Sequence, residues 1–114
     1  MPDYRLIITP DAIEDLAELR NYIADVLLAP DTALAYIQTI RREIGSLARM
    51  PARHKCVDQE PWRSHGVRRI LVKNFYVYYR IDDPAGIVYV LNVIYARRDH
   101  LKALSHIQLD DPQA

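Results

Sequence analysis

The first third of the chain joins a short apolar run to the start signal of a helix. The run at residues 6–8 predicts a strand over residues 4–9. Thr9 is a favourable N-cap, and Pro10 fits the first turn of a helix. Acidic residues such as Asp15 are expected on the solvent side of this helix. Apolar residues at three- and four-residue steps predict its buried face, namely Ile13, Leu16, Leu19, Ile23, Val26 and Leu27.

A second helix is predicted after a brief break at residues 28–30. Pro30 and Asp31 repeat the helix start signal, and Pro51 ends the pattern. The short connection predicts that the two helices are antiparallel neighbours. The buried face of the second helix is predicted to hold Ala33, Ile37, Ile40, Ile44 and Leu47.

The second half of the chain predicts strands, because apolar and polar residues alternate there. Three strands are expected at residues 67–73, 75–82 and 87–96, with a tight turn near Lys73 and a hairpin loop at residues 82–86. The last strand is apolar on both sides and is therefore expected to be central. One of its faces is expected to hold Val88, Val90 and Ile94, and the other Ile87, Leu91 and Val93.

The strand at residues 75–82 is expected to have one core face and one accessible face. Phe75, Val77, Tyr79 and Ile81 form the expected core face, and Tyr76, Tyr78 and Arg80 the accessible one.

The remaining segments complete a single-domain prediction. Residues 51–66 lack periodicity and are expected to be a long loop. A short helix is expected over residues 99–106, followed by a polar tail at residues 107–114. The sequence thus predicts one α+β domain over residues 1–114: an N-terminal strand, an antiparallel helix hairpin, a three-stranded antiparallel meander that completes one sheet, and a short C-terminal helix.

Composition narrows the class of protein. The 114 residues have a mass of 13.2 kDa, with 50% hydrophobic and 26% charged residues, which suits one packed domain. Neither a membrane-spanning run nor a signal-peptide pattern is found, so a cytoplasmic protein is expected. Cys56 is the single cysteine, and the four histidines have no zinc-site spacing. We therefore expect neither metal nor cofactor.

The net charge is zero, but the charged residues are distributed unevenly along the chain. Residues 1–31 carry two basic and seven acidic residues, residues 32–80 ten basic and three acidic, and residues 81–114 three basic and five acidic. Twelve of the fifteen basic residues are arginines, which suit bidentate contacts with phosphate or carboxylate groups. An acidic partner and an ordinary solvated surface of mixed charge both account for this pattern.

Basic residues gather on strands that are expected to lie together. They are Arg68, Arg69, Lys73, Arg80, Arg97 and Arg98. Such a cluster can hold a phosphodiester and stabilise charge that develops on phosphorus, or it can consist of strand-edge arginines paired with aspartates. His100 is a candidate general acid or base, or an exposed residue of the last helix.

Aromatic residues offer a second set of candidates. Four tyrosines, at positions 76, 78, 89 and 95, can stack bases, or serve simply as amphipathic strand residues. The loop at residues 54–65 can flank a substrate groove, or it can cap the core with Trp62.

The whole pattern resembles the RelE/ParE superfamily of bacterial type II toxins. Residues 66–72, 76–81 and 93–99 carry the resemblance most specifically, and it extends over nearly the full chain. The resemblance implies a growth-inhibiting toxin that is neutralised by a small antitoxin encoded beside it, in a toxin–antitoxin hetero-oligomer. A disordered antitoxin segment would wrap the toxin as it folds.

RelE-like members of the superfamily cleave ribosome-bound mRNA. Arg69 and Arg98 match basic positions of these enzymes, whereas Tyr76 and Leu104 replace an arginine and a tyrosine. If this chain is such a nuclease, the resemblance implies that the 2′-hydroxyl attacks the neighbouring phosphate. Arg69 and Arg98 would stabilise the transition state and His100 would transfer a proton, without a metal.

ParE-like members instead poison DNA gyrase and lack the nuclease residues. The long helix hairpin and the ending at residues 94–101 resemble this branch more closely, so the sequence slightly favours gyrase as the target. The candidate contacts to target or nucleic acid are Arg68, Lys73, Tyr76, Arg80 and Arg97. A non-toxic interaction module on the same scaffold is the third hypothesis.

Overall fold

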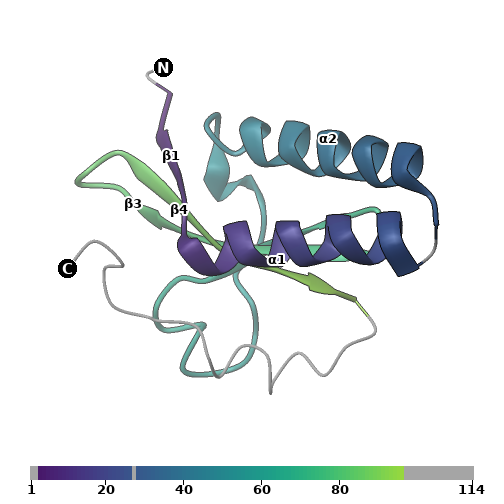
Figure 1. Cartoon of the computed structure of the whole chain (residues 1–114). Coiled ribbons are helices and arrows are strands. Elements are labelled where there is room, and N and C mark those ends of the chain that lie inside the picture. The colour runs from purple at the N-terminus through teal and green to yellow at the C-terminus, as the bar shows by residue number, and fades with distance from the viewer. Residues whose placement is uncertain (1–2, 27, 97–114) are drawn as a thin grey trace.

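A four-stranded sheet carries a helix hairpin on one face in the computed structural model, which describes residues 3–26 and 28–96 (Figure 1). The strand order is β1-β4-β3-β2, with β1 parallel to β4 and the other pairs antiparallel. The helices are α1 (Pro10–Asn21), a turn of π-helix (Tyr22–Val26), α2 (Pro30–Ser46) and a 3-10 turn (Pro51–Arg53). The strands are β1 (Arg5–Ile8), β2 (Arg68–Val72), β3 (Phe75–Asp82) and β4 (Ile87–Tyr95).

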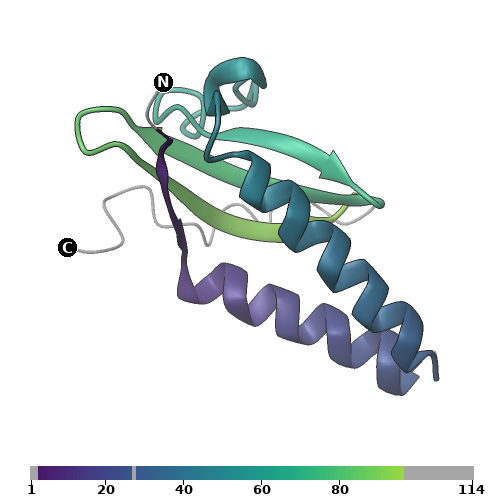
Figure 2. The same ribbon diagram turned by 90° about the horizontal axis from the view of Figure 1, so that it is seen from above.

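The arrangement confirms the predicted α+β fold. The two helices run side by side in opposite directions (Figure 2), and β4 is central as expected. The turn between β2 and β3 has φ angles of 53° at Lys73 and 76° at Asn74. Two successive left-handed residues are what a tight hairpin turn requires. The predicted helix at residues 99–106 lies outside the described residues.

Thr9 fixes the point where β1 gives way to α1. Its hydroxyl accepts a hydrogen bond from the Ala12 amide at 3.4 Å, which caps the helix as predicted. The same hydroxyl lies 2.8 Å from the Val90 carbonyl oxygen and donates to it. Because Thr9 is buried, this link joins the start of α1 to the middle of β4.

Asp15 forms a second link between α1 and β4. β1 ends at Ile8, which is paired with Val90, so the edge of β4 beyond that point has no neighbouring strand. The Oδ2 atom of Asp15 accepts hydrogen bonds from the Val93 amide at 2.8 Å and from Asn92 Nδ2 at 3.0 Å. The expectation that Asp15 faces solvent is therefore wrong, because α1 lies against the open edge of the sheet.

The predicted buried face of the first helix is confirmed at Leu16, Leu19 and Ile23 but is wrong at Ile13. Ala12, Leu16, Leu19 and Ile23 are buried, whereas Ile13 is 55% exposed. A helix turns about 100° per residue, so the small side chain of Ala12 takes the contact expected of Ile13. The predicted face of α2 is confirmed, since Ala33, Ile40, Ile44 and Leu47 are buried and Ile37 is partly buried.

A β-bulge reverses part of the predicted pattern in β4. Tyr78 is opposite Asn92, whereas Tyr79 is opposite Val90, so Leu91 is an extra residue in β4. Strict alternation fails beyond this point. Val93 packs on the helix side and Ile94 on the other side, the opposite of the prediction.

The face of the sheet away from the helices has a core of its own. Residues 57–67 fold over this face, and Trp62 is 8% exposed. Backbone hydrogen bonds from Val57 to Val67 and from Val67 to Trp62 close the loop. The second core consists of Val57, Trp62, Val67, Tyr78, Tyr89, Leu91 and Ile94.

This second core corrects one prediction and decides between two others. Tyr78 is fully buried, so the expectation that it lies on an accessible face is wrong. The loop at residues 54–65 caps the core through Trp62, as one of the two interpretations of this segment proposed. The 3-10 turn at Pro51–Arg53 directly precedes this segment, and a β-bridge joins Cys56 of the segment to Arg68 of β2.

Replacing Trp62 tests how much the loop contributes to stability. We expect Trp62→Ala to lower the free energy of unfolding by about 3–5 kcal/mol, because it leaves a cavity between loop and sheet. The control is Leu71→Ala at a residue that is 60% exposed on β2, with an expected change within about 0.5 kcal/mol. Urea unfolding followed by circular dichroism measures both. Equal effects of the two substitutions would contradict the second core.

Asp15 makes a pH-dependent contribution to stability. Burial raises the pKa of its carboxyl group, although the hydrogen bonds from Val93 and Asn92 oppose the shift. The folded state therefore holds this proton more tightly than the unfolded state, and ionisation of Asp15 lowers stability as pH rises through the ordinary carboxyl range to the raised pKa.

Two variants at position 15 separate the charge from the hydrogen bonds. Asp15→Asn keeps an oxygen acceptor, so we expect at least wild-type stability at pH 7 and a smaller difference from the wild type at pH 4. Asp15→Ala leaves the Val93 amide unpaired and is expected to cost about 1–3 kcal/mol. Urea unfolding at both pH values measures this. The prediction fails if the asparagine variant loses as much stability as the alanine variant at pH 7.

Candidate functional site

Arg69 is held on the sheet by two tyrosines of β3. Its guanidinium carbon lies 4.1 Å from the centre of the Tyr76 ring, within the range of a cation–π contact. Its Nη1 atom donates a hydrogen bond of 3.3 Å to the Tyr78 hydroxyl. The contact arises because Arg69 and Tyr78 are directly opposite each other in the ladder of β2 and β3. Arg69 itself remains exposed.

Arg80 lies on the same face and also stacks on a tyrosine. Its guanidinium carbon is 4.4 Å from the centre of the Tyr89 ring, which belongs to the second core. Its Nε atom is buried and has no hydrogen-bond partner among the described residues. Tyr76 and Arg80 share one face, as the sequence predicted, and the structure adds Arg69 to it; both arginines stack on the aromatic residues there.

Among the described residues of this face, the Tyr78 hydroxyl is not a base at neutral pH. Burial raises the pKa of Tyr78, and the hydrogen bond from Arg69 only partly opposes that shift. The Tyr78 hydroxyl is therefore protonated at neutral pH. Its role is to hold Arg69 in place rather than to accept a proton.

Arg68 points to the opposite side and supports the loop. Its Nη1 atom donates to the backbone carbonyl of His54 and, at 3.4 Å, to that of Ala52. The neighbouring Tyr79 hydroxyl donates to the Pro51 carbonyl at 2.6 Å, and burial raises the pKa of Tyr79 to about 12. Partial burial and two nearby arginines lower the pKa of His54. Arg68 is thus a structural residue and does not meet Arg69.

Lys73 is separated from both arginines. It lies in the turn between β2 and β3, where its Nζ atom is 5.6 Å from the centre of the Tyr36 ring on α2. Arg97, Arg98 and His100 lie outside the described residues. Of the predicted site residues, the described part of the chain therefore brings together only Arg69, Tyr76 and Arg80.

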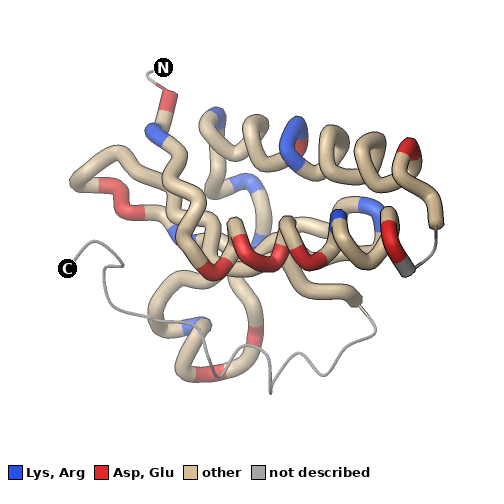
Figure 3. Tube along the Cα trace, in the orientation of Figure 1, with Lys and Arg blue, Asp and Glu red and all other residues tan. Residues whose placement is uncertain are grey.

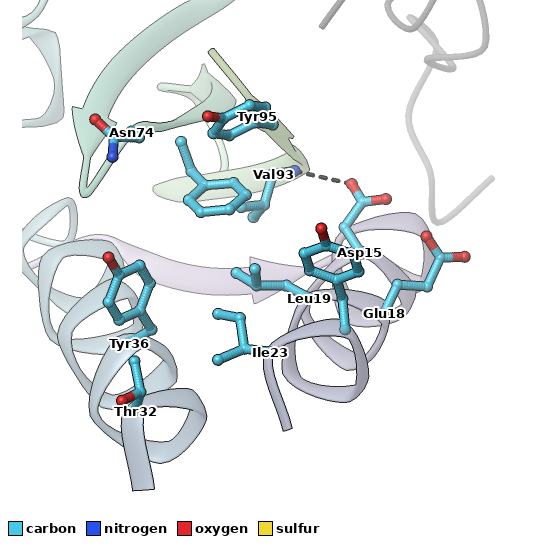
Figure 4. A pocket seen from close by; sticks show the side chains of 11 residues that line it. Asp15, Glu18, Leu19, Ile23, Thr32, Tyr36, Asn74, Val93 and Tyr95 are labelled. Carbon is cyan, nitrogen blue, oxygen red and sulfur yellow. Dashed lines mark hydrogen bonds between the residues drawn. The ribbon is translucent and has the colours of Figure 1, made fainter. Parts of the chain in front are cut away.

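A cavity on the helix side was not predicted from the sequence. It has a volume of about 690 Å³ and lies between the tip of the helix hairpin and the adjoining ends of β3 and β4 (Figure 4). We call it the hairpin cavity. Its walls are mostly apolar and aromatic, with two carboxylates among them, and include Asp15, Glu18, Tyr22, Tyr36, Phe75 and Tyr95.

The signal of this cavity in the sequence is the pair of aromatic residues Tyr22 and Tyr95. In the structure they are 53% and 42% exposed, which is high for large aromatic residues. Both continue apolar patterns at the ends of α1 and β4, where those patterns run beyond the core. Pattern alone does not reveal that the two ends meet.

Two further properties of the described residues concern metal binding and membrane insertion. Within residues 3–26 and 28–96, no three His, Cys, Asp or Glu side chains lie close enough together to hold a metal ion. No helix in this part of the chain is long and apolar enough to cross a bilayer.

Comparison with solved structures places the fold among toxin–antitoxin systems. A chain of the chromosomal ParDE system from P. aeruginosa superimposes with a TM-score of 0.68 at 22% identity, covering 82% of this chain and 97% of that one. A chain of the RelBE2 toxin–antitoxin complex from Mycobacterium tuberculosis gives 0.59 at 26% identity, covering 83% and 93%. A mutant of the E. coli toxin RelE in the free state gives 0.60 at 13% identity, covering 89% and 92%.

Sequence comparison identifies the family. No curated protein matches the chain significantly. The family model described as the ParE toxin of the type II toxin–antitoxin system parDE matches residues 6–100. That match extends from β1 through the helix hairpin and the whole sheet, so it includes every element described above. The chain therefore belongs to the ParE toxin family of type II toxin–antitoxin systems.

Proposed function

We propose that this toxin inhibits growth by poisoning DNA gyrase, as ParE-like toxins do, rather than by cutting mRNA. One observation carries the proposal: residues 57–67 pack over the sheet face that carries Arg69 and Arg80, the strand arginines on which a RelE-like enzyme would depend. The match to the ParE family model supports the same choice.

Coverage of this face argues against a phosphodiester there. A nuclease of this type needs several cationic groups that converge on one phosphate. Arg80 lies against the buried Tyr89 ring, and Arg68 is directed to backbone carbonyls on the other side of the sheet. Only Arg69 of these three is exposed. One guanidinium can contact a phosphate, but it does not make a site that surrounds the charge of a transition state.

The alternative, a ribosome-dependent mRNA endonuclease, is favoured by the geometry of Arg69. Its guanidinium is exposed and is held rigidly by Tyr76 and Tyr78, and catalytic groups are commonly preorganised in this way. Under this alternative, Arg69 and Arg98 would stabilise the transition state, and His100 would transfer the proton.

We also propose that a small antitoxin, encoded beside this toxin, binds and neutralises it. The matching family is defined by a toxin–antitoxin system, and two of the similar structures come from such systems. The polarised charge of the chain suits a partner with charged segments of its own.

The order in which DNA synthesis and protein synthesis stop distinguishes gyrase from mRNA as the target. After tightly controlled induction, we expect incorporation of labelled thymidine to fall before that of labelled methionine, with induction of the DNA-damage response. With purified gyrase and plasmid, the toxin should increase the linear DNA released by detergent. If methionine incorporation falls first, the mRNA endonuclease is supported instead. If neither falls, the chain is the non-toxic module.

An arginine double variant tests the nuclease site directly. Arg69→Ala with Arg98→Ala would abolish mRNA cleavage if these residues form the catalytic site. Under our proposal, cells that express either the wild type or the double variant have the same pattern of mRNA 5′ ends, which primer extension measures. Glu14→Ala, an exposed change on α1, is the control. Cleavage in the wild type that disappears in the double variant would refute gyrase as the sole target.

A further inference from the structure

Positive charge is concentrated on the outer side of the second half of α2. Arg41, Arg42 and Arg49 are exposed, and the exposed Arg53 joins them from the 3-10 turn that follows. Figure 3 shows basic residues in the second half of this helix and just beyond its end. Arg41 and Arg42 lie four and three residues before Gly45, and Arg49 lies four residues after it, so all three adjoin Gly45. We call this surface the basic face of α2.

This face keeps most of its positive charge for a partner. Within residues 3–26 and 28–96, Arg49 is the one member of the face with a carboxylate within 4 Å, since its Nε atom lies 3.7 Å from Asp3 Oδ1. Both of these side chains are more than half exposed, and exposed ion pairs contribute little to stability. Glu43 precedes Gly45 by two residues, which corresponds to about 200° of helix rotation. It therefore lies on the other flank of α2.

Arg53 is already fixed against the end of α2. Its Nη1 atom donates to the Arg49 carbonyl at 2.8 Å, and its Nη2 atom donates to the Ser46 hydroxyl at 3.2 Å. Its Nε atom donates to His54 Nε2 at 3.2 Å. A guanidinium group has five N–H donors, so two remain for a partner. Because the side chain is held in place beforehand, binding loses less conformational entropy.

Gly45 is the residue of this face that the fold does not require. Glycine is a poor helix former compared with alanine. The φ angle of Gly45 is not left-handed, and a Cβ atom at this position would meet nothing within 4 Å outside its own turn of the helix. The residue also precedes the C-cap Leu47, so it is not a terminating glycine. The missing side chain instead allows a partner to approach the helix backbone between the arginines.

We propose that the basic face of α2 contacts the phosphate backbone of the duplex DNA that gyrase holds. Arg41, Arg42, Arg49 and Arg53 bind phosphate oxygens, and Gly45 lets the sugar–phosphate backbone lie against the helix. The toxin then binds two surfaces at once, one of gyrase and one of its DNA. This inference rests on the proposed function and goes beyond it by naming DNA as a direct partner.

Several features favour duplex DNA as the partner. All four cations of the face are arginines, whose guanidinium groups match phosphate in a bidentate geometry. Single-stranded nucleic acid is disfavoured, because it needs exposed rings for stacking, and Tyr36, the aromatic residue of α2, is partly buried. The neighbouring α1 is acidic and repels phosphate, so α2 is the helix that faces the DNA.

The charge of the whole chain explains why gyrase is needed for this contact. The net charge is zero, and four cations alone support only weak, salt-sensitive binding to free DNA. When gyrase holds both the toxin and the duplex, the second contact becomes intramolecular, and its contribution to affinity increases.

A double variant tests the contact with DNA. Labelled full-length toxin is titrated with purified gyrase, with and without a linear duplex, and fluorescence anisotropy measures the affinity. We expect the duplex to tighten binding of the wild type by about tenfold. Arg41→Gln with Arg42→Gln should lose most of this gain, yet bind gyrase alone as the wild type does. Its plot of log affinity against log salt should be shallower by about 2, because two phosphate contacts are missing.

Arg20→Gln is the matched control for the double variant. Arg20 is an exposed arginine on the other helix of the hairpin. We expect this variant to keep the full gain in affinity from the duplex. Thermal unfolding checks that all variants keep the fold.

A substitution at Gly45 tests the close approach of the DNA backbone. Because Gln favours a helix more than Gly does and open space surrounds the position, Gly45→Gln is expected to raise the melting temperature by about 2–5 °C. The same change should weaken binding to the gyrase–DNA complex by about fivefold or more, because the added side chain keeps the backbone away. The matched control, Ala35→Gln, is exposed in the first half of α2 and should leave this affinity unchanged.

The outcomes separate this inference from the proposed function. If the duplex does not tighten binding of the wild type, or the double variant and Gly45→Gln keep the full gain, the inference is wrong while gyrase remains the target. If the double variant also binds gyrase alone more weakly, the basic face contacts the protein, and the inference is again wrong. If the wild-type toxin does not bind gyrase with or without DNA, the proposed function fails as well.

Discussion

The edge of β4 is the constraint on which the rest of this structure depends. β1 covers that edge only as far as Val90, and Thr9 and Asp15 provide polar partners for the part that follows. Buried backbone groups must find such partners, because an unpaired group costs about 1–3 kcal/mol. α1 is thereby fixed against the sheet by two side chains only six residues apart. The hairpin and the cavity at its tip take their positions from this contact.

The two faces of the sheet have different consequences for function. The helix side carries the hairpin cavity, whose aromatic walls extend to exposed rings. The other side is covered by the loop with Trp62, and its arginines stack on tyrosines. Cationic groups that are already stacked contribute to the stability of this face. The described structure thus offers a partner a more open surface on the side with the helices than on the side covered by the loop.

Local signals in the sequence were sufficient for most of the fold. The Thr9 cap, the tight turn at Lys73 and the bounds of β3 all depend on neighbouring residues, and the prediction of each was confirmed. Errors arose where distant segments meet. Helical periodicity placed Asp15 in solvent because it contains no information about the edge of β4. Alternation likewise gives no sign of the bulge at Leu91.

The candidate site was predictable to a similar extent. The shared face of Tyr76 and Arg80 followed from alternation along one strand. The position of Arg69 on that face depends on the register between β2 and β3, which alternation does not give. The covering loop could not be predicted either, because residues 57–67 have no periodicity to indicate where they pack. The hairpin cavity combines residues from α1, α2, β3 and β4, so only the assembled structure defines it.

The parallel pairing of β1 with β4 has a consequence for synthesis on the ribosome. Residues that are partners in this pairing, such as Leu6 and Val88, are separated by most of the chain. A nascent chain can form the helix hairpin early, but β1 has no partner until the last described strand has been made. Loop closure over such a distance is entropically costly and slows folding. The sheet therefore cannot be completed while translation is under way through the first three strands, and β1 stays unpaired during that interval.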